Sequence, residues 1–106
     1  PTMTTFEDRE RAYEAKFAHD EEMAFRVNAR RNKLLGLWAA DLLGRTGADA
    51  EAYALEVVKA DFQEAGHEDV VRKVAADLGA RASAEMIRAR MAELLVVAKG
   101  QIVDEA

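Results

Sequence analysis

The chain has 106 residues, enough for one hydrophobic core but too few for two independent cores, so we expect a single domain over residues 1–106. Half of the residues are hydrophobic, a third are charged and one is proline, which favours an all-α fold; the lack of cysteine excludes disulfides and thiolate metal sites. The net charge of −5 argues against nucleic-acid binding, and without an apolar run of about 20 residues we expect a cytoplasmic protein that does not insert into a membrane.

The first predicted helix is long. It begins near Phe6, because Thr4 and Thr5 offer hydroxyl caps and acidic residues follow in the first turn. No glycine or proline then appears until Gly36, and Gly44 is the natural left-handed stop. The sequence therefore predicts one helix of roughly 40 residues, or two helices with a bend.

The apolar pattern changes along this helix. Phe6, Tyr13 and Phe17 form a narrow aromatic stripe, whereas the apolar residues are dense from Met23 to Leu43. A narrow stripe buries little surface, so such a segment is only marginally helical by itself. We therefore predict a projecting or loosely packed arm over residues 5–19 and a helical bundle over residues 20–106.

The rest of the chain has the periodicity of shorter helices joined by short loops, for which an antiparallel four-helix bundle is the default packing. Tyr53, Val57 and Phe62 are expected on an inner face, and Gly100 is expected to close the last helix. The expected further helices span about 50–65, 68–78 and 83–100.

A metal-dependent phosphohydrolase is one alternative function, because His19, Asp20 and His67 are residue types that hold divalent ions. Adjacent helical residues point about 100° apart, and the two histidines form no His-x-x-x-His pair. The sequence therefore predicts no metal site and no catalytic residue, unless these side chains converge in the fold.

A basic stripe suggests another alternative. Arg26, Arg30 and Lys33 recur at helical spacing, within a segment (26–45) that holds five bases against one acid. Such a stripe is more often solvated than ligand-bound, but it could contact the phosphates of ADP or ATP in a helical nucleotide-sensing module. No other cofactor is expected.

Several blocks resemble the zeta subunit, the inhibitor of the alphaproteobacterial F-type ATP synthase. The longest is TTFEDRERAYEAKFAHDEE (4–22). It is followed by ARRNKLLGLWAA (29–40), VVKADF (57–62) and AGHEDV (65–70), so that the resemblance covers about residues 4–75. Tyr13 stands where the family is associated with phenylalanine, and Pro1 and Thr2 precede the usual start.

The resemblance implies a four-helix regulatory protein, monomeric when free, that is not an enzyme. Its N-terminal segment would enter the catalytic sector, formed by the alpha, beta and gamma subunits at the cytoplasmic face of the membrane, and block ATP hydrolysis and reverse rotation. Aromatic and basic side chains are the usual binding anchors. The expected partner contacts of the arm are Phe6, Arg9, Arg11, Tyr13, Lys16, Phe17 and His19.

Overall fold

The computed structural model describes residues 5–62 and 66–105, with side chains described from residue 19 onward. Within these ranges the structure is helical and contains no strand. The all-α prediction is confirmed. The elements are α1 (Thr5–Leu42), α2 (Gly47–Ala60), α3 (Glu68–Leu78), the short 3-10 helix η1 (Gly79–Arg81) and α4 (Ala84–Glu105).

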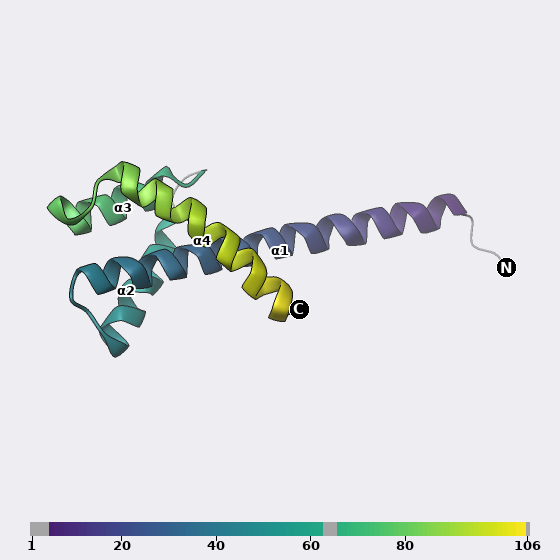
Figure 1. Cartoon of the computed structure of the whole chain (residues 1–106). Helices are drawn as coiled ribbons and strands as arrows, with labels where there is room; N and C mark the ends of the chain where they lie inside the picture. Colours follow the sequence, from purple (N-terminus) through teal and green to yellow (C-terminus); the bar gives the residue numbers. More distant parts are fainter. Residues whose placement is uncertain (1–4, 63–65, 106) are drawn as a thin grey trace.

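Helix α1 is a single uninterrupted helix of 38 residues, which corresponds to about 57 Å at roughly 1.5 Å per residue. Its N-terminal part extends well beyond the other helices (Figure 1), and the molecule measures 66 × 26 × 20 Å along its principal axes. The helix ends at Leu42, and Gly44 follows with a φ of 74°, as the sequence predicts. The long first helix with a projecting N-terminal part is confirmed.

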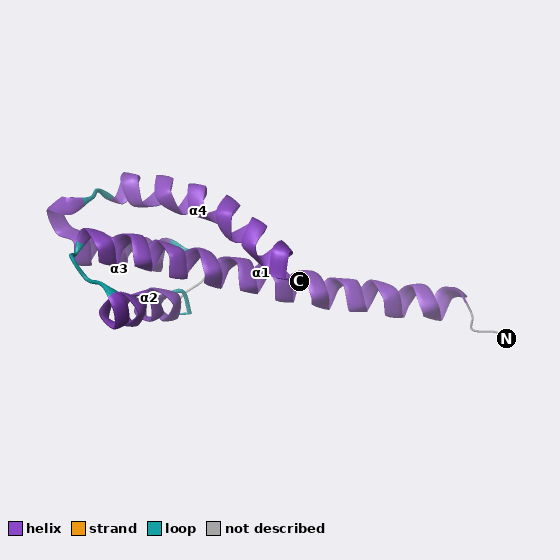
Figure 2. Ribbon diagram, turned by 60° about the horizontal axis from the view of Figure 1, so that its bottom comes forward, coloured by secondary structure: helices purple, strands orange, loops and turns teal. Residues whose placement is uncertain are grey.

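The C-terminal half of α1 packs with the other three α-helices into an antiparallel bundle (Figure 2). On α2, Ala54 lies beside Gly36 of α1, while Phe62 beyond the end of α2 lies beside Phe25, so these two helices run in opposite directions. The side chain of Tyr53 on α2 likewise meets that of Asp77 near the end of α3. The core is formed by the buried apolar side chains Leu35, Ala39, Ala40, Tyr53, Val57, Val70, Val71, Val74, Leu78, Ala82, Ile87 and Met91.

The predicted end of the second helix is wrong. Helix α2 ends at Ala60, and Phe62, expected in the core, is 65% exposed. The backbone N–H groups of Asp61 and Phe62 bond to carbonyls three residues back, at 3.4 and 3.2 Å. This turn is tighter than an α-helical one, so it rotates Phe62 off the inner face.

The predicted end of the last helix is also wrong. Its start is confirmed, because the Ser83 hydroxyl accepts a hydrogen bond from the backbone N–H of Met86 at 3.1 Å. Helix α4 nevertheless continues through Gly100 to Glu105. Beyond Gly100, Ile102 is 2% exposed, so burial of an apolar side chain favours continuing the helix past a glycine.

Gly36 and Gly100 provide a matched pair of helical glycines for testing this packing. A Cβ at Gly36 would lie 2.6 Å from the Ala54 Cα, whereas a Cβ at Gly100 would meet no atom within 4 Å. We predict that Gly36→Ala lowers the free energy of unfolding by about 1–3 kcal/mol through forced helix separation. Gly100→Ala should raise it by about 0.5–1 kcal/mol, because alanine loses less backbone entropy. Chemical denaturation measures the free energy of unfolding of both variants. If the two substitutions changed it equally, the close contact of Gly36 with Ala54 would be contradicted.

Candidate functional site

The arm predicted from the sequence is the N-terminal part of α1. Its backbone is helical from Thr5, and in Figure 1 it runs out of the bundle along the axis of α1. The predicted contacts at positions 6, 9, 11, 13, 16 and 17 lie outside the side chains that the structure describes. His19, the last predicted contact, is exposed. The geometry of the arm is therefore that of a continuous helical rod.

The basic stripe lies where the arm joins the bundle. Arg26, Arg30 and Lys33 line one cavity of about 310 Å³, so the prediction that they share a face of α1 is confirmed. Their environments differ, because the Arg30 guanidinium donates two hydrogen bonds to Glu105, at 2.6 and 2.9 Å, and a third to Gln101 at 2.8 Å. Arg26 lies 3.9 Å from Glu105, and Lys33 is exposed.

The pair of Arg30 and Glu105 joins the start of the bundle to the end of α4. Its hydrogen bond raises the pKa of Arg30 and lowers the pKa of Glu105. Sequence reasoning missed this pair, since the two residues are 75 positions apart and only the antiparallel packing of α1 and α4 brings them together. Arg30 therefore ties two helices together as well as lining the cavity.

A buried polar network lies on the neighbouring face of α1. Arg31 is 4% exposed and Asn32 is 1% exposed. The Arg31 Nε donates to Asn32 Oδ1 at 3.1 Å, and its Nη2 lies 2.9 Å from the Nδ1 of His67. Burial lowers the pKa of Arg31, and the nearby charge of Asp61 opposes that shift. The network attaches the connection between α2 and α3 to α1.

His67 is shared between two partners. Its Nδ1 lies 2.9 Å from the Arg31 Nη2 and 3.0 Å from the Asp61 Oδ1. An unprotonated Nδ1 accepts from Arg31, whereas a protonated Nδ1 donates to Asp61. Sequence reasoning did not single out Arg31, although it lies four residues from both Val27 and Leu35 on an otherwise apolar face. This spacing of four residues from two apolar positions was the feature of the sequence that could have indicated a buried arginine.

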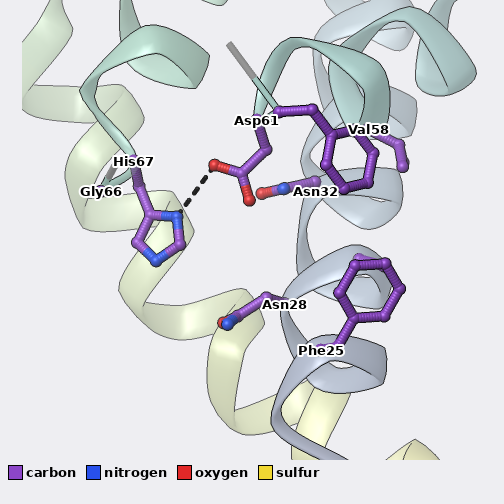
Figure 3. Close-up of a pocket in the computed structure, with 9 residues that line it drawn as sticks. Phe25, Asn28, Asn32, Val58, Asp61, Gly66 and His67 are labelled. Carbon is purple, nitrogen blue, oxygen red and sulfur yellow. Dashed lines mark hydrogen bonds and ion pairs between the residues drawn. The ribbon is translucent and has the colours of Figure 1, made fainter. Parts of the chain in front are cut away.

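Beside this network is a cavity of about 370 Å³, shown in Figure 3. One wall is aromatic: the rings of Phe25 and Phe62 lie with centroids 5.9 Å apart and are tilted by 31°. Asn28 and His67 lie across from Phe25 in the close-up. The full lining is Phe25, Asn28, Ala29, Asn32, Val58, Asp61, Phe62, Gly66 and His67.

The family model for the ATPase inhibitor subunit zeta matches residues 3–101 of the chain. The chain belongs to this zeta inhibitor family. The match includes the arm, the basic stripe, the Arg31 network and the cavity beside Phe25, and omits only the first two residues and the end of α4. The resemblance stated from the sequence is thereby confirmed as family membership.

The fold of the chain is also supported by a solved structure. A solution NMR structure of a protein is 56% identical to this chain and superposes with a TM-score of 0.74. The match covers 79% of this chain and 99% of the other. None of the curated proteins matches the chain significantly.

The phosphohydrolase alternative finds no support in the described side chains of this zeta-family chain. Among residues 19–62 and 66–105, no three histidine, cysteine, aspartate or glutamate side chains lie close enough to hold a metal ion. His67 contacts Arg31 and Asp61 instead.

Among the residues that the structure describes, no helix is both long and apolar enough to cross a membrane.

The ion pair between Arg30 and Glu105 predicts a measurable lowering of the pKa of Glu105. In the native chain we expect carbon-detected NMR to place the pKa of Glu105 below its ordinary 4.5, because Arg30 stabilises the carboxylate. The stabilisation is present above the unfolded-state pKa and is lost as pH falls through the lowered pKa. Arg30→Gln should move the pKa of Glu105 toward 4.5. The pKa of Glu68, which is lowered by Arg88, should not change in the Arg30→Gln variant. If the pKa values of Glu68 and Glu105 both shifted, the cause would not be the local contact with Arg30.

Proposed function

We propose that the chain inhibits ATP hydrolysis by an F-type ATP synthase, and that residues 5–19 are the inhibitory element. Two findings support this: membership of the zeta inhibitor family, and an α1 that extends far beyond the bundle. In this proposal the arm enters the catalytic sector of alpha, beta and gamma subunits at the cytoplasmic face of the membrane. The chain performs no chemistry and blocks the rotary cycle sterically.

The projecting helix is the observation that carries the proposal. From residue 5 to residue 19 it extends about 21 Å, and a single helix is about 10–12 Å thick with its side chains. The molecule measures 26 × 20 Å across its long axis, because the bundle is wider than the arm. A groove that admits the arm would therefore stop the bundle, which remains outside as an obstacle to rotation.

Continuity with the bundle helps the arm to bind. An isolated helix of this length is marginal because nucleation is unfavourable, whereas the arm continues a helix already formed in the bundle. Phe6, Tyr13 and Phe17 are the proposed apolar anchors, and the basic side chains of the arm are their companions. Any remaining cost of ordering the arm, of the order of 2–5 kcal/mol, is subtracted from the binding energy.

The inhibitory role of the arm is tested by ATP hydrolysis of the purified cognate synthase. We expect the full chain to inhibit and a chain lacking residues 1–19 not to inhibit, because the described core lies entirely after residue 30 and should fold without the arm. Alanine at Phe6, Tyr13 and Phe17 together should abolish most inhibition, whereas Val103→Ala, at an exposed position of α4, should have no effect. Circular dichroism controls for folding. Equal inhibition by full and truncated chains would refute the assignment of the arm.

A nucleotide-sensing role is the second candidate, supported by the cavity that Arg26, Arg30 and Lys33 line together. A bound phosphate would compete with Glu105 for Arg30. Titration with ADP should then shift the amide resonances around residues 26–33, and Arg30→Gln should weaken the response, whereas Arg88→Gln should not. Unchanged spectra at millimolar ADP would eliminate this candidate.

A further inference from the structure

Two exposed phenylalanines on the bundle have no structural role in its core. Phe25 is 57% exposed and Phe62 is 65% exposed, although the other described large aromatics, Tyr53 and Trp38, are buried or half-buried. Single exposed apolar residues are common, but gathered ones are typical of interaction sites. The two rings lie 5.9 Å apart and form the wall of a cavity of about 370 Å³.

The cavity is held in shape from both sides. Phe25 belongs to α1, and the backbone N–H of Phe62, just after α2, bonds to the Lys59 carbonyl at 3.2 Å. On the opposite wall, the Nδ1 of His67 lies within hydrogen-bond distance of both Arg31 and Asp61 and bonds to one or the other according to its protonation. A site whose walls are already fixed loses little conformational entropy when a ligand binds.

The cavity also continues the proposed binding face of the arm. Positions 6, 13, 17, 24 and 28 follow one another at intervals of seven and four residues, which keeps them on one face of a helix. Ala24 is small, and Asn28 lines the cavity without a side-chain hydrogen bond in the described part of the chain. A partner segment lying along this face would pass Ala24 and reach Asn28 about 16 Å beyond position 17.

The charges around the cavity indicate the chemistry of that segment. Phe25, Ala29 and Val58 separate the aromatic cavity from the second cavity, which is lined by the bases at positions 26, 30 and 33. In this basic rim, Arg30 and Arg26 already face Glu105, so a carboxylate of a partner would compete with Glu105 for them and would also meet the exposed Lys33. Charge complementarity therefore favours a segment with a bulky apolar side chain for the first cavity and carboxylates for the second.

We propose that the cavity beside Phe25 and Phe62 is a second docking site for the synthase. Its occupant is an acidic amphipathic segment of the catalytic sector that inserts one bulky apolar side chain between the rings of Phe25 and Phe62 and the amide of Asn28. This inference rests on the proposed inhibitory function. The arm blocks the rotation, and the second site anchors the bundle outside and lengthens the lifetime of the complex.

The test compares full-length chains in the hydrolysis assay. One variant carries Phe25→Ala and Phe62→Ala; its matched control carries Met86→Ala and Val96→Ala, at positions that are 54% and 71% exposed on α4. Truncation of binding anchors weakens association roughly tenfold or more. The phenylalanine variant should therefore raise the half-inhibitory concentration at least about tenfold, with full inhibition at saturation because its arm is intact. The control should match the parent.

The outcomes separate this inference from the proposed function. A parent chain that does not inhibit would refute the function, and the docking site with it. A parent that inhibits, together with a phenylalanine variant of equal potency, would refute only the docking site. Phe25-dependent self-association of the free chain in analytical ultracentrifugation would assign the surface to a second copy and also overturn the proposal.

A second measurement applies even if the alanine variant folds poorly. A benzophenone side chain introduced at position 62 should cross-link to a catalytic-sector subunit in the purified inhibited complex, and an excess of the parent chain should suppress the product. The same group at position 96 should give no product. Failure of the group at position 62 to cross-link in a complex that is demonstrably inhibited would overturn the second site.

Discussion

The structure depends on the close contact between α1 and α2 at Gly36. The backbone of Ala54 occupies the space in which any other residue at position 36 would place its Cβ. This approach brings Tyr53 and Val57 into the core, where α3 and α4 complete the packing. Farther along the same two helices, the ring of Phe62, just after α2, lies beside that of Phe25 on α1.

Polar contacts then specify positions that apolar packing leaves open. Arg31 is a buried charge, so leaving its guanidinium without partners would cost several kcal/mol, and its bonds to Asn32 and His67 avoid that cost. The exposed pair of Arg30 and Glu105 contributes less to stability. Its two parallel bonds nevertheless orient the end of α4 beside α1. Both interactions involve neighbouring residues, Arg30 and Arg31, in the half of α1 that packs into the bundle.

The shared helix α1 links these contacts to the proposed function. Because one continuous helix forms both the arm and the main packing surface of the bundle, the bundle determines the direction in which the arm projects. The cavity beside Phe25 lies just beyond that junction on the same helix. A partner that holds the arm is therefore brought close to the basic rim and to the two exposed rings.

The amino-acid sequence determined the helical class, the length of α1, its stop before Gly44 and the boundary between a sparse and a dense apolar stripe. These features depend on the spacing, capping and propensities of residues close together in the chain. Only the tertiary structure decided that Phe62 is exposed and that α4 continues past Gly100. It also decided that Arg31 is buried beside His67 of the α2–α3 connection, and that Glu105 pairs with Arg30 on α1. The reason is physical: burial and long-range pairing depend on how helices pack, and helical periodicity does not contain that information.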